Sequence, residues 1–318
     1  MSAKIDISVV ILNWNTERLL RRCLTSLLQD NSTGIVLEII VVDNASEDGS
    51  RKMVTSEFPE VHLVGNKKNI GFGAGNNRGA EVAKGRYILF LNSDTEVHEG
   101  CLVQLLRYAD SHPEAGIVGP KLLNADGSLQ YSCRHYPNLA TGFFRNTPLG
   151  RLFPGNKHNA DYLMSDWDHG SPRNVDWVSG AALMIRRTVA DKIGIFDEDY
   201  FMYCEDVDLC RRVNFAPLCE TTTDTWKVTY FPDALITHFI GRSSDKVPTR
   251  MTYEFHRSQY LFYRKHYRHT TPIIIRPLIP VGIIMRAMGQ LVRYRIKHIT
   301  NSIRTKKNQQ ENHSESRQ

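Results

Sequence analysis

The sequence lacks the markers of several common classes of protein. None of its six cysteines belongs to a CxxC pair, and no cysteine spacing resembles a zinc site. The first residues, MSAKIDISVV, lack the basic start, the long apolar stretch and the small-residue cleavage site of a signal peptide. We therefore expect a cytoplasmic protein with reduced thiols.

Long apolar runs and internal repeats are also missing. The most apolar stretch, residues 272–292, is interrupted by Arg276, Pro277, Pro280 and Arg286. It falls short of the about 20 uninterrupted apolar residues that a transmembrane helix needs. The 318 residues, 41% of them hydrophobic, are enough for one large domain with an appendage or for two ordinary domains.

Acidic residues are scarce in the last part of the chain. From Arg264 onward there are twelve Lys and Arg residues and only two acids, so this tail carries a net charge of +10 and the remainder −4. A neutral-to-acidic body with a basic tail is not typical of a nucleic-acid-binding domain. It favours contact of the tail with an anionic surface such as a membrane, the alternative being a solvated basic tail.

The same tail has the pattern of an amphipathic helix. Basic residues accompany an apolar stripe here. The stripe recurs every three or four positions, at Met285, Met288, Val292, Ile296, Ile299 and Ile303. Such a basic amphipathic helix can lie in a membrane interface at the inner face of the cell membrane. It can equally pack on the rest of the chain or on a second copy in a homodimer.

Strands and helices are expected to alternate over the first 111 residues. Apolar runs rich in β-branched residues predict buried strands at 7–13, 37–42, 61–64 and 87–91. Apolar spacing and stop signals predict helices at 16–29, 50–58, 76–84 and 101–111. This alternation predicts an α/β fold with a doubly wound, mainly parallel sheet flanked by helices. Periodicity weakens over 116–176, where we expect loops with short strands, and a further helix is expected at 253–267.

Polar residues follow three of the predicted strands. Asn13, Asp43 and Asp94 all stand at strand ends, where ligands bind in sheets of this kind. Asp94 ends the segment Asn92-Ser93-Asp94 and can hold Mg²⁺ or Mn²⁺ against the diphosphate of a leaving group, or it can cap the next segment. Asp43 can accept hydrogen bonds from a base or ribose, or it can belong to a helix cap.

Glycines crowd residues 69–77 (NIGFGAGNN). A dinucleotide-binding GxGxxG motif does not fit, because the last glycine position is Asn76 when counted from Gly71 and Arg78 when counted from Gly73. The cluster also follows the third predicted strand and not the first. This argues against a Rossmann oxidoreductase and leaves close approach of a ligand to the backbone, or a flexible turn before a helix.

Acids crowd the stretch 196–209 (FDEDYFMYCEDVDL). Glu205 and Asp206 are expected at the start of a helix that runs to residue 213, where the helix dipole keeps a carboxylate ionised. Such a group suits a general base that deprotonates a sugar hydroxyl. The alternative is a capping cluster on a surface helix, but the preceding Phe201-Met202-Tyr203 favours the functional interpretation. His238, after another predicted strand, is either structural or a neutral imidazole ligand for a metal.

In combination these segments resemble the family 2 inverting glycosyltransferases of GT-A fold, and most closely their rhamnosyltransferase-type branch. The segments that carry the resemblance are VVILNWN (9–15), VVDNAS (41–46), NIGFGAGNN (69–77), ILFLNSD (88–94), VDWVSGAALMIRR (175–187), FDEDYFMYCEDVDLCRR (196–212) and PDALITHFIGRSS (232–244). No single segment decides the assignment, but their common order over about residues 5–245 makes it specific.

The resemblance implies roles for individual residues. It makes Asp206 the catalytic base, Glu205 its support or an acceptor contact, and Asp94 and His238 the ligands of a divalent cation. It places the nucleotide-sugar donor and the acceptor against Asn13, Asp43, Asn69, Gly71, Asn77, Ser93, Trp177 and Gly180. We expect a GT-A catalytic domain at 1–250, with a nucleotide-binding half to about 115 and an acceptor half from 116, followed, from the composition and apolar spacing, by a helical extension at 251–304 and a disordered tail at 305–318.

The sequence departs from the family pattern at two places. Position 92 is Asn where many relatives have Asp, so metal binding depends more on Asp94, His238 and the diphosphate. Residues 214–225 (NFAPLCETTTDT) stand where relatives have a short glycine turn, and a surface insertion near the acceptor is one interpretation.

The expected reaction is transfer of a sugar, rhamnose from dTDP-rhamnose as the first choice, to a hydroxyl of a glycan or lipid-linked glycan in surface polysaccharide synthesis. Two alternatives stay open: a metal-dependent sugar nucleotidyltransferase and a non-catalytic sugar-binding protein of the same fold. The first would want a basic, glycine-rich triphosphate loop after the first strand, and residues 12–18 offer little of that.

Overall fold

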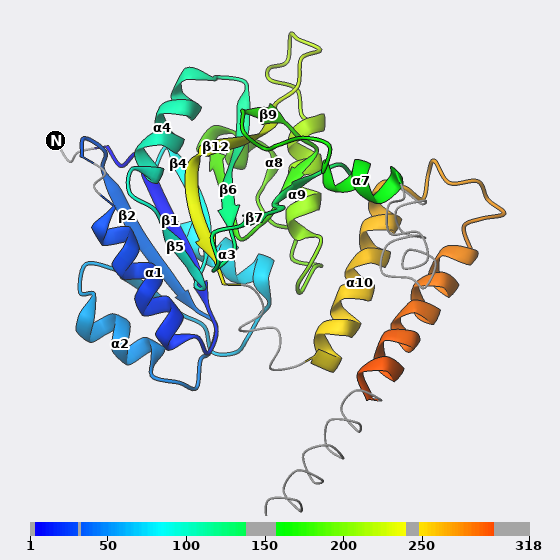
Figure 1. Ribbon diagram of the computed structural model, residues 1–318, viewed down its shortest axis with the longest axis horizontal. Helices are drawn as coiled ribbons and strands as arrows, with labels where there is room; N and C mark the ends of the chain where they lie inside the picture. Colours follow the sequence, from blue (N-terminus) through cyan, green and yellow to red (C-terminus); the bar gives the residue numbers. More distant parts are fainter. Residues whose placement is uncertain (1–3, 31–32, 138–156, 240–247, 296–318) are drawn as a thin grey trace, which may run out of the picture. The chain divides into compact units, whose positions relative to one another are not determined.

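The computed structural model describes residues 4–30, 33–137, 157–239 and 248–295. The chain divides after Lys246 into two compact units, and each is described by itself. The first unit holds a mixed β-sheet with its helices, and the second holds α10 and a further helical segment (Figure 1).

Strands and helices alternate in the first half of the first unit, as the apolar patterns predict. The elements there are β1 (Ile7–Asn13), α1 (Glu17–Gln29), β2 (Leu37–Asp43), α2 (Ser50–Glu57), β3 (His62–Gly65), α3 (Phe72–Val82), β4 (Tyr87–Asn92), β5 (Thr95–Val97) and α4 (Cys101–Ser111). Burial of Leu20, Leu24 and Leu27 along one face of α1 shows why this spacing gives a helix packed on a sheet.

The second half of the first unit combines short paired strands with two long elements. Its elements are β6 (Ala115–Leu123), β7 (Leu129–Gln130), β8 (Cys133–Arg134), α7 (Lys157–Leu163), β9 (Arg173–Asn174), β10 (Trp177–Val178), β11 (Ala182–Arg186), α8 (Arg187–Ile193), α9 (Glu205–Phe215) and β12 (Lys227–His238). β8 and β10 pair with each other apart from the main sheet.

The main sheet has the strand order β3-β2-β1-β4-β11-β6-β12-β5, with β7 on β6 and β9 on β12. β3, β2, β1 and β4 are parallel to one another, and β6 is parallel to β12. β11 is antiparallel to both β4 and β6, and β5 is antiparallel to β12. The parallel block brings the carboxyl ends of β1, β2 and β4 to one edge of the sheet, where ligands bind in folds of this kind.

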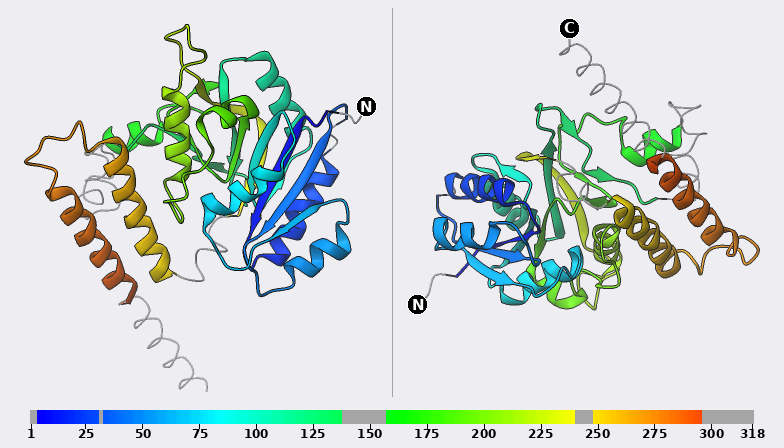
Figure 2. Two further views of the ribbon diagram at one scale, coloured as in Figure 1. Left: turned by 180° about the vertical axis from the view of Figure 1, so that it is seen from behind. Right: turned by 90° about the horizontal axis from the view of Figure 1, so that it is seen from below.

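Helices cover both faces of the sheet. α1, α2 and α4 pack on one face, where their buried side chains share a core with alternate residues of β1, β2 and β4 (Figure 1). α3, α8 and α9 lie on the other face, which the reverse view shows (Figure 2). Gly79 of α3 fits closely there, since a Cβ at this position would lie 2.4 Å from Val10 and 2.9 Å from Val42.

The expectation of loops and short strands over 116–176 is wrong at its start. β6 is a nine-residue strand in the middle of the sheet, between β11 and β12. Its glycines lower its intrinsic strand propensity but leave room for neighbours, because a Cβ at Gly119 would lie 2.6 Å from Val178 and one at Gly116 would lie 2.9 Å from Val213. Packing of β10 and α9 on β6 therefore outweighs local propensity.

Residues 216–226 form the loop between α9 and β12, within the stretch expected to be an insertion. Trp226 donates to the carbonyl of Ala216 and Leu218 to that of Asp224, so the loop closes as a hairpin. The loop connects the C-terminal end of α9 to the first residue of β12. Asp206 lies at the N-terminal end of α9 and His238 at the C-terminal end of β12, so each lies at the end away from the loop. A position of this insertion near the acceptor stays a prediction.

The second unit contains α10 (Pro248–His266) and a helical segment at 278–295. Among the residues that the structure describes, no helix is long and apolar enough to cross a membrane. The expected disordered tail at 305–318 and the apolar positions 296, 299 and 303 lie outside the described residues.

Candidate active site

The ends of three parallel strands meet at the site. Asn13, the last residue of β1, pairs in register with Asp43, the last residue of β2, and Leu12 pairs with Asn92 at the end of β4. Polar side chains that the sequence spaces about 30 and 50 residues apart therefore lie at one edge of the sheet, as expected from the strand assignments.

Asp43 is held by its neighbours on both carboxylate oxygens. Its side chain is almost fully buried, and it accepts hydrogen bonds from the Asn13 amide at 3.1 Å, the Ser46 backbone N–H at 3.0 Å and the Arg51 guanidinium at 2.5 Å. Arg51 also donates to the carbonyl of Asn66 and remains about half exposed. Arg51, which sequence reasoning missed, is thus the part of this ion pair that a ligand reaches most easily.

The glycine segment contacts the chain just before α9. Gly71 has φ +96°, and its neighbour Phe72 donates a backbone hydrogen bond of 2.7 Å to the carbonyl of Phe201, just before α9. A Cβ at Gly71 would lie only 2.5 Å from that carbonyl oxygen. Asn69 accepts the Gly71 backbone N–H, so it fixes this turn. Of the two interpretations of this segment, close approach of a ligand to the backbone stays a prediction, and the turn itself is hydrogen-bonded to the chain before α9. α3 begins at Phe72, four residues earlier than predicted.

Asn77 also bonds to the acidic segment. Its amide nitrogen donates to the carbonyl of Phe196 at 2.8 Å, its amide oxygen accepts the Phe196 N–H at 3.1 Å, and it also contacts the carboxylate of Glu198. Both ends of the Asn77 amide are therefore used in holding residues 196–198 against α3. A donor contact by Asn77 stays a prediction.

Glu205 and Asp206 open α9, as the sequence predicts. The two preceding residues, Tyr203 and Cys204, have φ values of +72° and +66°, a strained backbone of the kind found at functional sites. Burial and the charge of Asp206 raise the pKa of Glu205 well above its usual range. Burial also raises the pKa of Asp206 above the ordinary value of 3.8, while the N–H groups of Gly180 and Val207 and the charge of Arg134 oppose the rise.

Asp206 is oriented by the backbone that follows β10. The Gly180 N–H donates to its Oδ2 at 3.0 Å, and a Cβ at Gly180 would lie 3.3 Å from the Cβ of Asp206. The next residue, Ala181, accepts the backbone N–H of Asn92 at 2.9 Å. Two consecutive residues therefore connect the carboxylate on α9 with the end of β4.

Arg134 and Trp177 lie on the paired strands β8 and β10, beside Asp206. The Arg134 guanidinium is 5.0 Å from the centre of the Trp177 ring, and Trp177 donates its indole N–H to the carbonyl of His135. The Arg134 Nε is buried and has no partner among the described residues, and the same holds for Oε2 of Glu205. Unpaired buried polar atoms beside a carboxylate indicate a place where a ligand or water completes the bonding.

His238 and Asp94 face each other on two adjacent strand ends. The His238 Nε2 is 3.3 Å from the Asp94 Oδ1 and 3.4 Å from the Asn92 amide, and the backbone of Phe239 donates to the carbonyl of Asp94. No cluster of three or more His, Cys, Asp and Glu side chains suited to a metal occurs in the described part of the chain. A cation here would have two protein ligands and would take its others from phosphate and water, which suits Mg²⁺ or Mn²⁺.

Ser93 connects this pair to the strand ends. Its buried hydroxyl is 2.8 Å from that of Thr16, which in turn donates to the amide oxygen of Asn13. The structure therefore uses Ser93 to join β4 to β1. A direct contact of Ser93 with the nucleotide-sugar stays a prediction.

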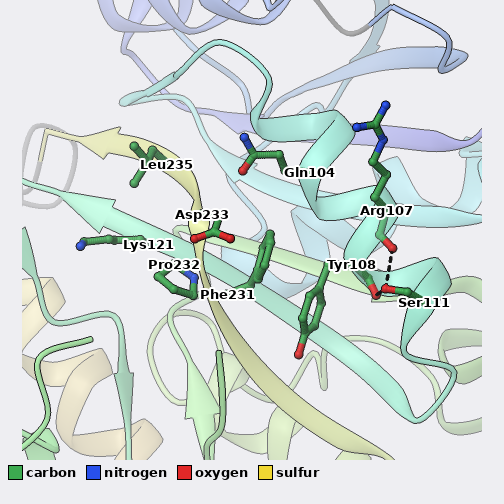
Figure 3. Close-up of a pocket in the computed structure, with 9 residues that line it drawn as sticks. All are labelled: Gln104, Arg107, Tyr108, Ser111, Lys121, Phe231, Pro232, Asp233 and Leu235. Atoms are coloured by element: carbon green, nitrogen blue, oxygen red, sulfur yellow. Dashed lines mark hydrogen bonds between the residues drawn. The ribbon is translucent and has the colours of Figure 1, made fainter. Parts of the chain in front are cut away.

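A surface hollow of about 660 Å³ lies elsewhere on this unit (Figure 3). It is formed by α4 and by β12 where that strand bulges, with Tyr108, Phe231 and Asp233 in its wall. None of the predicted site residues lines it. We therefore assign the site to the strand ends and α9.

A family model described as glycosyl transferase family 2 matches residues 8–194. The chain belongs to this family. This glycosyltransferase therefore uses a nucleotide-sugar, as the family resemblance in the sequence implies, and the family favours a glycosyltransferase over the nucleotidyltransferase and the non-catalytic sugar-binding protein considered above.

Named rhamnosyltransferases are among the similar proteins. The N-acetylglucosaminyl-diphospho-decaprenol L-rhamnosyltransferase of Mycobacterium tuberculosis is 31% identical over 71% of this chain and 74% of its own length. The rhamnosyltransferase WbbL of Escherichia coli K12 is 28% identical over 65% of this chain and 76% of its own. These matches confirm the rhamnosyltransferase-like branch.

Solved structures confirm the GT-A fold. The mannosyltransferase PcManGT of Pyrobaculum calidifontis, solved with GDP-Man and Mn²⁺, has a TM-score of 0.54 at 14% identity and covers 93% of this chain and 76% of its own. TarS of S. aureus has a TM-score of 0.52 at 14% identity and covers 90% of this chain and 72% of its own. At this identity the likeness concerns the fold alone.

Proposed function

We propose that this glycosyltransferase transfers a rhamnosyl group from dTDP-rhamnose to a hydroxyl of a lipid-linked, diphosphate-bearing N-acetylglucosamine acceptor, with inversion at the anomeric carbon. The observation that carries the proposal is Asp206, a carboxylate of raised pKa that accepts the Gly180 N–H, while the next residue, Ala181, accepts the N–H of Asn92 at the end of β4, two residues before Asp94 of the Asp94–His238 pair. The names of the mycobacterial and enterobacterial relatives support the choice of sugar and acceptor.

Asp206 acts as the general base in this mechanism. The acceptor hydroxyl attacks the anomeric carbon while the bond from that carbon to the diphosphate breaks, and the hydroxyl proton passes to the Asp206 carboxylate. A carboxylate whose pKa is raised by burial holds a proton more readily than an ordinary aspartate does. Glu205, whose pKa is raised further, is the better candidate for a neutral hydrogen-bond donor beside it.

The departing diphosphate lies against the Asp94 and His238 pair. These two residues would hold a divalent cation, which when bound supplies charge stabilisation to the leaving group. The geometry fits such an ion, because a carboxylate oxygen and an imidazole nitrogen face each other at 3.3 Å on strands that β12–β5 pairing holds together. The Mn²⁺ in the PcManGT structure supports the same class of ion.

We also propose that the second unit binds the surface of an anionic membrane, which brings the enzyme to a lipid-linked acceptor. Its helical segment exposes Leu278, Val281, Met285, Met288 and Val292, with 53 to 68% of each side chain accessible, at a spacing of three and four residues. Ile273 and Ile274 in the preceding turn are 76% and 85% exposed. Exposed apolar side chains that gather along one segment are typical of a surface that binds a partner or a membrane.

The charge of this surface selects its partner. Residues 267–295 contain five arginines and no acid, so two copies packed face to face would bring like charges together. An anionic lipid surface accepts both the apolar stripe and the arginines. Recovery of the protein with phosphatidylglycerol vesicles tests this proposal.

Conversion of Asp206 to asparagine tests the catalytic proposal. We expect Asp206→Asn to lower kcat at least about 100-fold, since general base catalysis contributes about that much or more, and to leave dTDP binding unchanged. Asp199→Asn is the matched control, because Asp199 is an exposed acid of the same segment. The measurement is rhamnose transfer from dTDP-rhamnose to a diphosphate-linked N-acetylglucosamine lipid, with the product anomer assigned by NMR.

Two results would contradict this assignment. Near-normal transfer by Asp206→Asn would remove the general base. A product that retains the donor configuration would remove the single displacement. Transfer from a different nucleotide-sugar would change the donor but not the mechanism.

A further inference from the structure

Gln130 makes two contacts with His238 that determine how this ring presents its nitrogens. Its amide oxygen lies 2.7 Å from the His238 Nδ1, and its amide nitrogen donates to the backbone carbonyl of His238 at 3.2 Å. The same amide nitrogen donates to the side-chain oxygen of Asn124 at 2.9 Å. Gln130 belongs to β7, the short strand that pairs with β6 beside β12.

The backbone carbonyl settles the orientation of the Gln130 amide. A carbonyl oxygen only accepts hydrogen bonds, so the group that faces the His238 carbonyl must be the Gln130 NH₂. The Gln130 oxygen, itself an acceptor, then faces the His238 Nδ1, and Nδ1 must carry the hydrogen. In the neutral imidazole the lone pair therefore lies on Nε2, the nitrogen that faces Asp94 at 3.3 Å.

We propose that Gln130 is a positioning residue that holds His238 as its Nδ1–H tautomer and so presents the Nε2 lone pair to the divalent cation of the proposed function. A histidine that binds a metal commonly donates its other N–H to a fixed acceptor, which sets the ring orientation and raises the affinity for the ion. Gln130 supplies that acceptor through a neutral amide, and the β6–β7 hairpin fixes the amide through Asn124.

The hairpin also explains why an amide serves here. A carboxylate at position 130 would accept from Nδ1 but would place its second oxygen against the His238 carbonyl and the Asn124 oxygen, both acceptors. The amide bonds both groups at once and adds no charge next to Asp94. The side chain thus fixes the tautomer and the backbone position of His238 together.

The test uses Gln130→Met, which keeps the volume of the side chain and removes both contacts. The first measurement is a long-range ¹H–¹⁵N spectrum of the metal-free, ¹⁵N-histidine-labelled full chain at about pH 8, where a free imidazole is neutral. The His238 resonances are those lost in His238→Asn. We expect the Nδ1–H tautomer in the unaltered protein and a mixture containing Nε2–H in Gln130→Met.

The second measurement is Mn²⁺ affinity in the presence of dTDP, from the paramagnetic resonance signal of the free ion. We expect Gln130→Met to weaken Mn²⁺ binding about 10- to 100-fold. Gln104→Met, on the α4 side of the unit, makes the same exchange of side chains away from His238 and should leave both readings unchanged.

The two measurements separate the two proposals. An unaltered tautomer in Gln130→Met, with Mn²⁺ affinity within about twofold of the original, would overturn the role of Gln130. An original protein that shows the Nε2–H tautomer would overturn it as well. If the original protein binds no Mn²⁺ with dTDP, the metal in the proposed function fails, while the spectrum still decides whether Gln130 sets the tautomer.

Discussion

At the scale of single side chains, Arg134 is a charged residue of the candidate active site that the sequence did not indicate. Its guanidinium stacks on Trp177, its Nε lacks a partner among the described residues, and its charge lowers the pKa of Asp206. Gln130 and Arg134 lie four residues apart, so one short segment contacts His238 and also acts on the charge of the Asp206 carboxylate on α9.

Removal of Arg134 should move the acidic limb of the pH profile. The base is active when ionised, and Arg134 holds the pKa of Asp206 below the value that burial alone would give. In Arg134→Gln this pKa rises, so kcat/KM should fall at a higher pH, with a shift of up to about one pH unit. Arg173→Gln is the control, since Arg173 stacks on Trp167 and is not among the charges that act on Asp206. An unmoved limb would show that Asp206 is not the titrating base or that Arg134 does not reach it.

The sequence points to the candidate site residues themselves more readily than to the residues that contact them. Asp94 and Asp206 stand out in the sequence because acids follow apolar runs, a pattern that strand and helix ends produce. Gln130, Arg51 and Arg134 carry no such pattern, because their partners are 108, 8 and 72 residues away along the chain. Only the folded arrangement brings these pairs together.

At the scale of elements, the contact between the glycine segment and the loop before α9 connects α3 with the helix that carries Asp206. Gly71 and the preceding Asn69 place the start of α3 against Phe201, and Asn77 binds residue 196 one turn further on. α3 and α9 are therefore coupled through backbone contacts, and an error at this joint would displace Asp206.

We expect Gly71→Ala to lower the free energy of unfolding by two separate effects. The backbone of Gly71, with φ +96° and ψ 179°, lies in a region that glycine almost alone occupies and costs an alanine about 1 to 3 kcal/mol, and the clash with the Phe201 carbonyl adds about 1 to 3 kcal/mol. Gly34→Ala is the matched control, since Gly34 has φ +88° with nothing within 4 Å of the added Cβ. Urea unfolding of both variants measures the difference. Equal losses would show that the close contact with Phe201 does not exist.

The predicted elements succeeded where a local pattern and the packing agree. β1, β2, β4 and α4 appear almost where apolar periodicity places them, because each buries its own apolar face. The prediction was wrong at β6 and at the first turn of α3. Glycine weakens the local sequence signal at both places, and close packing requires glycine there. The rule that glycine breaks elements does not hold where a neighbour occupies the space of a Cβ.

The two units of the whole molecule differ in what they bury. The first unit places its apolar side chains in cores on both faces of the sheet, whereas the described part of the second leaves ten large apolar side chains exposed between residues 273 and 294. The sequence predicted the basic and apolar character of this segment. The isoleucines of the turn before the helix belong to the apolar stretch 272–292 that the sequence shows, but to no helical repeat.

Exchange of two methionines on the exposed stripe should weaken membrane binding. Met285 and Met288 are 68% and 62% exposed, so Met285→Gln/Met288→Gln should leave folding intact while removing apolar area from the contact. We expect at least about a tenfold drop in the partition coefficient onto phosphatidylglycerol vesicles, measured by flotation of the full chain. Phe215→Gln in the first unit is the control, because Phe215 is 66% exposed.

The original protein should bind phosphatidylcholine vesicles more weakly and lose phosphatidylglycerol binding in high salt, since salt screens the charge of the arginines. Equal flotation of all variants would contradict the membrane proposal. If the original protein and Phe215→Gln sediment as dimers and the methionine variant as a monomer, the stripe instead binds a second copy of the chain.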